Sequence, residues 1–252
     1  MAVPGMNRAF VPALLVIMAP ALAASAGDAL AAQSRPAPVV VELFTSEGSS
    51  TSPPADAYLG ALASQPGIIS LDLHVDYWNY IGWTDPYASK AASDRQRGYA
   101  RQLGLRYVYT PQMVINGTKE GVGSAREAIS QLIADTAAGK DAHVGVAVTR
   151  GQAGEILVHI DAGATAEPAT IWLVGFDREH TTQVLHGENE GQFLRDYQVV
   201  RSLKDIGSWT GEALNLSLAE NAVTGDGGVV VLVQLHGTGR IVGAATVKTP
   251  TS

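Results

Sequence analysis

Two serines stand at the spacing of a redox-active cysteine pair. Ser49 and Ser52 lie in the stretch 47–54, which reads E-G-S-S-T-S-P-P, and cysteines at these two positions would form the C-x-x-C motif of thiol–disulfide exchange. The 252 residues contain no cysteine. Because the nucleophile of that reaction is a thiolate and a serine hydroxyl is far less acidic, the chain by itself cannot catalyse dithiol exchange. Only a cysteine supplied by a partner protein would restore the chemistry.

The hydroxyl of Ser49 has two other interpretations. As a hydrolytic nucleophile it would need a base, and the sequence has neither a G-x-S-x-G elbow nor a histidine close to Ser49. His74 or His186 would have to approach it in space, because catalytic triads are defined by geometry. We favour the second interpretation, in which Ser49 to Ser52 cap the helix that follows. The free amides of such a helix start could still hold an anion or a peptide carboxylate.

A second cluster of candidate binding residues follows the next predicted strand. It consists of His74, Asp76, Tyr77, Trp78 and Trp83. His74 and Asp76 are two positions apart, so on a strand they share one face and could ligate a metal or share a proton. The alternative, which we favour, is a buried and hydrogen-bonded His74 whose aromatic neighbours pack as local core.

Thr110 and Pro111 form the third candidate. A bond preceding proline is the only peptide bond for which the cis isomer costs little, although a proline that starts a strand is usually trans. The order of the surrounding elements and the family resemblance given below favour cis-Pro111. The loop would then face Ser49 and Ser52 and offer its backbone to an extended peptide.

The first half of the chain alternates between predicted strands and helices. Proline at the first helical turn, an Asn116-Gly117 turn and a capping box formed by Ser124 and Glu127 mark the boundaries. We predict strands over 38–44, 68–75, 112–115 and 118–122, and helices over 53–66, 88–103 and 124–139. This β-α-β-α-β-β-α order is that of a thioredoxin core, and it predicts an α/β domain over 36–140.

The second half shows apolar alternation at short intervals, separated by glycine-containing turns. Such a pattern is typical of an antiparallel sandwich. We predict a β-rich, sandwich-like domain over 142–250, with its boundary near Gly139-Lys140-Asp141. The predicted strands are 144–149, 156–160, 171–176, 198–203, 214–218, 229–235 and 241–247.

Several longer motifs resemble those of one family. They are Val41–Gly48, P-P-A-D at 53–56, H-V-D-Y-W at 74–78, Gly82-Trp83, Arg95-Gln96, Tyr109–Gly117 and G-E-N at 187–189. The chain resembles a secreted bacterial family of unknown function with a thioredoxin-like N-terminal domain (domain of unknown function 1223). That family typically has cysteine at the positions of Ser49 and Ser52, so both sulfurs are replaced here.

The N-terminus and the composition indicate the compartment. Arg8 followed by the apolar run 9–23 and by small residues is typical of a cleaved signal peptide, which we place at about 1–32. The net charge of -7 disfavours nucleic acid and anionic membrane surfaces as partners. We expect a periplasmic or secreted protein without a membrane anchor after signal cleavage. We expect no cofactor, because the sequence shows no phosphate-binding loop and no zinc ligand set.

Three functions are compatible with these patterns. The first is a non-catalytic binding protein that uses the surface around Ser49, Ser52 and Pro111 for an extended peptide, a small ligand or another periplasmic protein. The second is a thiol–disulfide oxidoreductase family member in which the cysteines were replaced, either in nature or by design. The third is a ligand- or carbohydrate-binding role for the C-terminal β domain.

Overall fold

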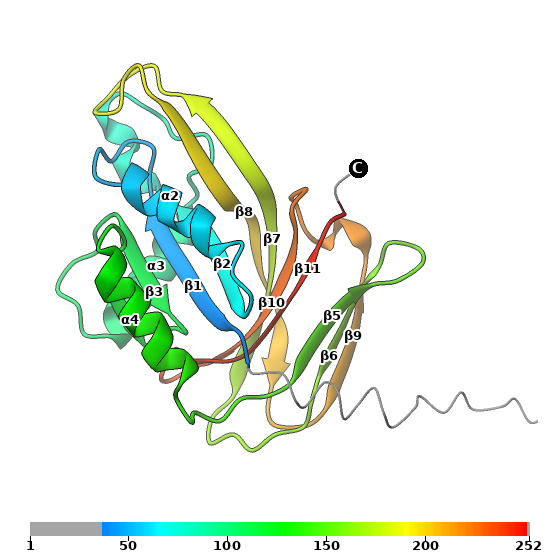
Figure 1. The fold of residues 1–252 in the computed structure, drawn as a ribbon. Coiled ribbons are helices and arrows are strands. Elements are labelled where there is room, and N and C mark those ends of the chain that lie inside the picture. The colour runs from blue at the N-terminus through cyan, green and yellow to red at the C-terminus, as the bar shows by residue number, and fades with distance from the viewer. Residues whose placement is uncertain (1–36, 251–252) are drawn as a thin grey trace, which may run out of the picture. The chain divides into compact units, whose positions relative to one another are not determined.

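A computed structural model describes residues 37–250, so the predicted signal peptide lies outside the described residues. This part of the chain has a mixed α/β architecture in which a large β-sheet carries a small number of helices (Figure 1). None of its helices is long and apolar enough to cross a membrane.

The first half contains the predicted elements in the predicted order. Strand β1 is buried along its whole length; it runs parallel to β2 and antiparallel to β3, which forms a hairpin with β4. The loop of aromatic residues after β2 is a 3-10 helix, η1. The bounds are β1 Val39–Thr45, α2 Pro53–Leu62, β2 Ile68–His74, η1 Asp76–Ile81, α3 Lys90–Gln102, β3 Gln112–Ile115, β4 Lys119–Val122 and α4 Arg126–Ala137.

The second half adds strands to the same sheet. The eight-stranded sheet has the order β11-β10-β7-β8-β2-β1-β3-β4, so it continues across the predicted boundary near Gly139. The domain division itself stays a prediction. Strands β5, β6 and β9 form a separate three-stranded sheet. The bounds are β5 Val146–Arg150, β6 Ile156–Ile160, β7 Ala169–Gln183, β8 Phe193–Trp209, β9 Leu214–Leu218, η2 Glu220–Ala222, β10 Gly228–Leu235 and β11 Ile241–Lys248.

Both sheets contribute to one hydrophobic core in this half. Val158 of β6 packs in a buried cluster with Ile171 of β7 and Val231 of β10. Alternate residues of β6 are buried, as the apolar alternation predicts, whereas every residue of β10 is buried. The strands therefore lie in two packed sheets.

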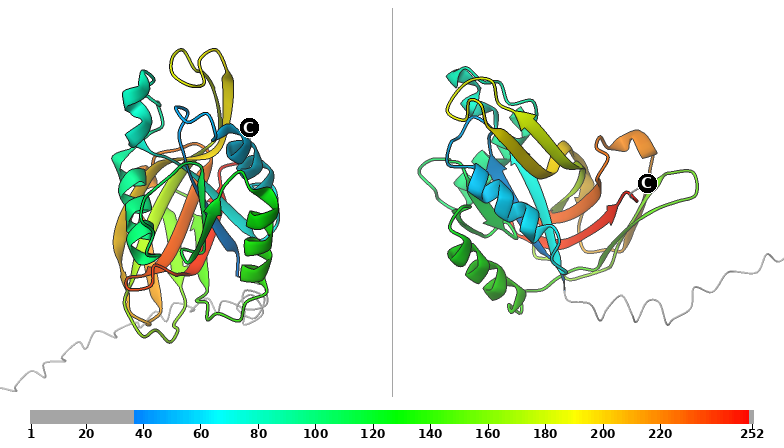
Figure 2. Two further views of the ribbon diagram at one scale, coloured as in Figure 1. Left: turned by 90° about the vertical axis from the view of Figure 1, so that its left-hand side faces the viewer. Right: turned by 45° about the horizontal axis from the view of Figure 1, so that its top comes forward.

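Strands β7 and β8 are much longer than the sequence predicts. They have 15 and 17 residues, against the predicted runs 171–176 and 198–203. The extra part of β7, over 177–183, is polar and only partly buried, so it lacks the apolar alternation by which strands are recognised. The two strands form an antiparallel arm that extends beside β1 and β2 (Figures 1 and 2).

Helix starts differ in part from the predicted capping. The capping box of Ser124 and Glu127 is not formed, because α4 has Ala125 at its N-cap and no side-chain cap. A backbone turn from Ala125 N–H to the Val122 carbonyl, 2.9 Å, moves the helix start past Ser124. By contrast, Ser89 caps α3 by accepting the Ala92 N–H at 3.1 Å.

A buried polar network joins α3 to both halves of the sheet. Arg95 of α3 donates to the Glu42 carboxylate of β1 at 2.5 Å and to Gln234 of β10 at 3.1 Å. The hydroxyl of Tyr99 also donates to Glu42. Since a buried charge pair is stable only when its remaining hydrogen-bonding groups are satisfied, this network fixes the position of α3 over the sheet.

Helix α2 packs closely on β8. A Cβ atom added at Gly60 would lie 2.5 Å from the ring of Tyr197, closer than two carbon atoms can approach. Glycine inside a helix usually lowers stability, so its presence at this position is explained by the close approach of the tyrosine ring.

We predict that Gly60→Ala lowers the free energy of unfolding by about 1–3 kcal/mol, because the new methyl group overpacks the contact with Tyr197. The matched control is Gly98→Ala in α3, where the nearest atom to an added Cβ is 3.9 Å away. This control should be neutral or stabilise by up to about 1 kcal/mol. Denaturant unfolding of the two variants gives the comparison; equal stabilities would contradict the packing of α2 on β8.

Candidate functional site

The two serines at the C-x-x-C spacing are buried. Ser49 is 1% exposed and Ser52 is 0% exposed, whereas Ser50 and Thr51 between them are exposed. The Ser49 hydroxyl pairs with Thr51 Oγ1 at 3.2 Å. His74 forms its hydrogen bond with a carboxylate instead of with Ser49. The geometry therefore gives no support to the hydrolytic interpretation of Ser49.

Ser52 occupies the N-cap position of α2 but does not cap it through its side chain. Its backbone is helical, with φ -78° and ψ -40°, whereas a capping serine normally has an extended backbone. The Ser52 carbonyl accepts the N–H groups of Ala55 and Asp56, and the Ser49 carbonyl accepts that of Ser52. The predicted side-chain cap is wrong because the preceding turn already continues into the helix. Within residues 37–250, the buried Ser52 hydroxyl has no hydrogen-bond partner.

The loop at the end of the β7–β8 arm covers this serine turn. Asn189 is 1% exposed, and its side-chain amide donates to the carbonyls of Glu47 at 2.8 Å and Ser49 at 3.1 Å. Glu188 accepts from the N–H and the hydroxyl of Ser50 at 3.1 and 2.6 Å. The polar sequence G-E-N at 187–189 suggests a solvated loop. In the structure it instead forms a contact between the two halves of the chain.

The predicted proline loop lies beside the serine turn. The Thr110–Pro111 bond is cis. Thr51 Oγ1 donates to the Thr110 carbonyl at 3.3 Å, and Trp78 Nε1 donates to Thr110 Oγ1 at 2.8 Å. These hydrogen bonds bring Thr51, Trp78 and Thr110 together; we call these three residues and Tyr80 the threonine–aromatic surface. Tyr80 is 83% exposed.

Gln96 of α3, part of the Arg95-Gln96 motif, fixes two parts of this region. It is fully buried, and its amide donates to the Tyr109 carbonyl at 2.7 Å and to the Gln112 side chain at 2.9 Å. Its carbonyl oxygen accepts from the Tyr77 hydroxyl at 3.1 Å. One side chain therefore connects η1 to the proline loop.

Asp76 and Trp83 are not partners of His74. Asp76 accepts a hydrogen bond from Ser93 of α3 at 2.5 Å, and Trp83 Nε1 donates to the Glu47 carboxylate at 2.9 Å. The pairing of His74 with Asp76, which was the less favoured interpretation, is absent because β2 ends at His74 and the chain turns into η1, so the alternation of a strand no longer applies.

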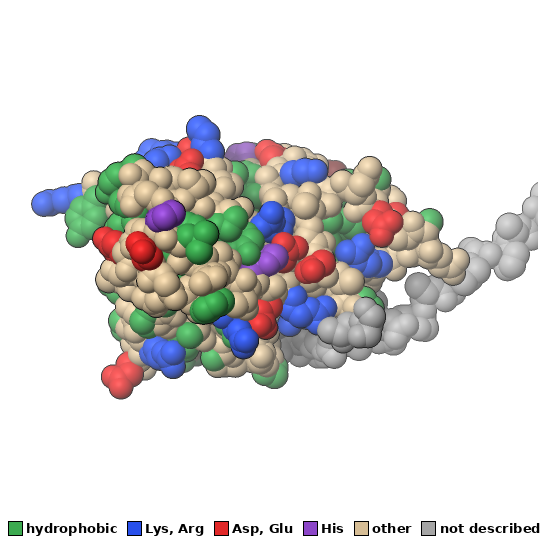
Figure 3. All heavy atoms as spheres, turned by 90° about the horizontal axis from the view of Figure 1, so that it is seen from above, with side chains coloured by type: hydrophobic (Ala, Val, Ile, Leu, Met, Phe, Trp, Pro, Cys, Tyr) green, Lys and Arg blue, Asp and Glu red, His purple; other side chains and the backbone are tan. Residues whose placement is uncertain are grey.

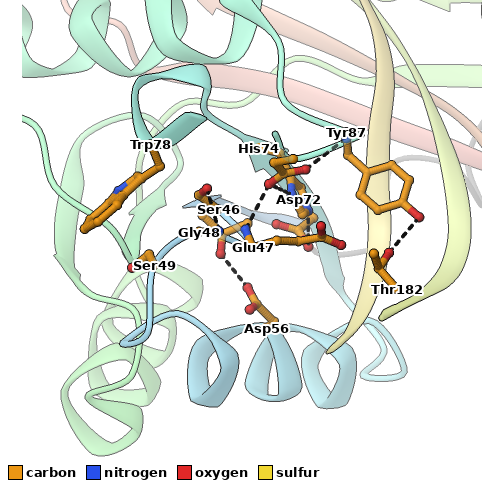
Figure 4. Close-up of polar contacts among 12 residues, drawn as sticks. Ser46, Glu47, Gly48, Ser49, Asp56, Asp72, His74, Trp78, Tyr87 and Thr182 are labelled. Atoms are coloured by element: carbon orange, nitrogen blue, oxygen red, sulfur yellow. Dashed lines mark hydrogen bonds and ion pairs between the residues drawn. The ribbon is translucent and has the colours of Figure 1, made fainter. Parts of the chain in front are cut away.

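His74 instead belongs to a buried group of carboxylates. Its Nδ1 atom lies 2.8 Å from Asp85, and its Nε2 atom lies 3.5 Å from Asp72 on the same strand. Asp196 of β8 brings a third carboxylate to the same place. Figure 4 shows Asp72, His74 and Asp56 gathered above α2, with Ser49 and Trp78 to one side of them.

The strands and helices that surround His74 position these acids. Asp85 accepts the N–H groups of Glu47 and Tyr87, both at 2.9 Å, which fixes its carboxylate toward His74. The Tyr87 ring packs edge-on against the imidazole, 5.4 Å between ring centres. On the other side Thr45 donates to Asp56 at 2.7 Å.

Burial dominates the ionisation of this group. It raises the pKa of Asp196 to about 8 and raises the pKa of Asp56 well above its ordinary value, with neighbouring carboxylates acting in the same direction. Burial also raises the pKa of Asp72, although the nearby His74 opposes this.

The pKa of the imidazole is raised as well, but by neighbouring charges and not by burial. Burial alone would lower the pKa of His74, but the charges of Asp85 and Asp72 outweigh it and raise that pKa well above its ordinary value. The pKa of Asp85 is lowered, because His74 and the two backbone N–H groups outweigh its burial. The group can hold protons or a cation, and its burial keeps it from contact with a large substrate.

One signal in the sequence points to part of this group. Ser70, Asp72 and His74 alternate with apolar residues in I-I-S-L-D-L-H-V, so polar side chains share one face of a buried strand. No comparable signal marks Asp56, Asp85 and Asp196. They lie on a helix, a loop and a distant strand, respectively, which meet only in the folded chain.

We predict that Asn189→Ala lowers the free energy of unfolding by about 1–3 kcal/mol, because it leaves buried carbonyl groups without a donor. Hydrogen exchange at the Ser50 amide, which Glu188 covers, should accelerate in the same variant. The control is Gln192→Ala, which removes only a 3.3 Å contact to Asn189. Unchanged Ser50 exchange in Asn189→Ala would contradict the covering role of the loop.

Comparisons with known proteins agree with this architecture. The chain resembles the X-ray crystal structure of protein AGR_C_4864 from Agrobacterium tumefaciens, with 33% identity over 87% of this chain and 98% of that chain and a TM-score of 0.75. No curated protein matches the chain. The family model described as protein of unknown function (DUF1223) matches residues 40–234. The chain belongs to that family.

Proposed function

We propose that the mature chain is an exported, non-catalytic binding protein with a thioredoxin-like scaffold over 36–140. Its ligand would be an extended peptide that contacts the threonine–aromatic surface. The observation that carries this proposal is the hydrogen bonding of Thr51 and Trp78 to Thr110, which joins the serine turn, the proline loop and η1 in one partly exposed region.

The thioredoxin-like interpretation is supported by topology. The first half has the β-α-β-α-β-β-α order, with β1 between a parallel and an antiparallel neighbour. The cis bond before Pro111 lies beside the turn that carries Ser49 and Ser52. This is the relation between proline loop and C-x-x-C turn that the family resemblance implies.

The binding surface lies next to the two serines and not on them. Ser49 and Ser52 are covered, so a ligand meets the exposed residues Ser50 and Thr51 first. Aromatic side chains supply large contact areas at small entropic cost, and the exposed Tyr80 belongs to the same 3-10 helix as half-buried Trp78. Seen from above, this end of the molecule mixes hydrophobic side chains with both charges (Figure 3).

We predict that a reduced, S-carboxymethylated polypeptide, which is extended and cannot exchange disulfides, binds the mature chain. Tyr80→Ala should weaken binding about tenfold, because an exposed aromatic anchor is removed without disturbing the core. Fluorescence anisotropy of the labelled polypeptide measures the affinity. Leu157→Ala is the control, since this exposed apolar side chain lies on β6 of the other sheet.

Two outcomes would contradict the proposal. Absence of binding to the wild-type chain is the first. The second is that Tyr80→Ala binds the polypeptide as tightly as the wild type, whereas Leu157→Ala binds it more weakly. That result would favour the β-rich half as the binding part.

A double variant separates the binding function from a redox function. We predict that Ser49→Cys/Ser52→Cys forms one intramolecular disulfide that reacts slowly with a thiol reductant, because both positions are almost completely covered. Adding Asn189→Ala should accelerate the reaction by removing the cover. Thiol counting and insulin reduction are the assays. Rapid insulin turnover by the double variant, or any turnover by the wild-type chain, would favour the oxidoreductase alternative.

A further inference from the structure

The group around His74 contains buried polar atoms that no described residue satisfies. Both carboxylate oxygens of Asp72, one oxygen of Asp196 and Nε2 of His74 have no hydrogen-bond partner within residues 37–250. The three side chains are 0%, 1% and 2% exposed, respectively. Buried polar groups are almost always paired, so four such atoms in one place indicate a bound species that completes their interactions.

The charge of the group indicates that this species is a cation. Asp72, Asp196 and Asp56 are all buried within the same region. Among the described residues, no lysine or arginine forms an ion pair with any of them. A single imidazole therefore faces several carboxyl groups, and a buried charge cluster requires a counter-charge or protonation.

The geometry fits a small divalent ion. One donor atom from each of Asp72, His74 and Asp196 can be chosen so that all lie within 4.8 Å of one another. His74 Nε2 and Asp72 Oδ2 are 3.5 Å apart, and two ligands about 2.1 Å from a tetrahedral ion lie about 3.4 Å apart.

The outer partners have the arrangement found around metal-binding histidines. A histidine that ligates through one ring nitrogen usually donates its other N–H to a carboxylate, which fixes the ring orientation and the tautomer. His74 Nδ1 pairs with Asp85 at 2.8 Å, and Asp85 is itself held by the N–H groups of Glu47 and Tyr87. His74 Nε2 is left facing Asp72.

We propose that Asp72, His74 and Asp196 bind one Zn²⁺ ion that links β2 to β8. A mixed set of one imidazole and two carboxylates suits Zn²⁺, whereas Ca²⁺ takes six to eight oxygen ligands and Mg²⁺ retains several waters. Binding releases the protons that these groups would otherwise hold.

The role of this ion is structural. All three ligands are almost completely covered, so a substrate has no access to the ion. Strands β2 and β8 share a single paired position, Asp72 with Val199, and the ion adds a second connection at that place. The ion would therefore hold the β7–β8 arm against the first half of the sheet.

The test uses the mature chain without a histidine tag, unfolded and refolded either with ZnCl₂ or with a chelator, because a buried site fills during folding. We expect about one zinc per chain by elemental analysis after gel filtration, and a higher midpoint of denaturant unfolding in the zinc sample. Asp196→Asn should lose both the zinc and the shift. Asp85→Asn should weaken zinc binding about 10–100-fold.

Two controls keep the result interpretable. His159→Gln removes an exposed histidine that pairs with Asp161, and it should retain one zinc per chain. When both are refolded in chelator, Asp196→Asn should be at least as stable as the wild type, because it removes one of several crowded buried carboxylates. That stability would show that the variant folds. Wild-type chain that refolds without zinc and shows the same midpoint in both samples would overturn the proposal. Equal zinc loss in Asp196→Asn and His159→Gln, or a larger shift with Mg²⁺ or Ca²⁺, would also overturn it.

Discussion

The contact between β2 and β8 is the constraint on which the rest of the molecule depends. It joins two β-rich halves through one paired position, Asp72 with Val199, at the place where buried carboxylates meet His74. Unpaired charges there would repel and open the sheet. Because β8 lies against β2 and α2, the β7–β8 arm extends far enough for Asn189 to reach the serine turn. The cover over Ser49 and Ser52 therefore depends on the contact between β2 and β8.

Glu47 links the buried group to the region that faces solvent. Its N–H donates to Asp85, its carboxylate accepts from Trp83, and its carbonyl accepts from Asn189. The single residue Glu47 thus contacts the group around His74, the loop after η1 and the β7–β8 arm.

The sequence predicted local features well and long-range contacts poorly. Apolar runs, the Asn116-Gly117 turn and the prolines at the start of α2 located most elements, because periodicity and turn chemistry act within a few residues. The joining of β2 to β8 and the contact of Asn189 with Ser49 depend on partners more than a hundred residues away. The length of the arm was missed because the outer part of β7 is polar and lacks apolar alternation. His74 was found as a buried, bonded residue, but Asp85 and Asp196 could not be assigned to it, because no spacing rule connects them.

The hydroxyl of Ser52, which has no partner within residues 37–250, has a consequence for the stability of the turn. A buried hydroxyl without a partner costs about 1–3 kcal/mol, whereas a thiol of similar size is a weak hydrogen-bonding group that packs as a small apolar side chain. The pocket around residue 52 is therefore better suited to sulfur than to oxygen. A cysteine at this position would keep the shape of the turn and remove the cost of the unpaired hydroxyl.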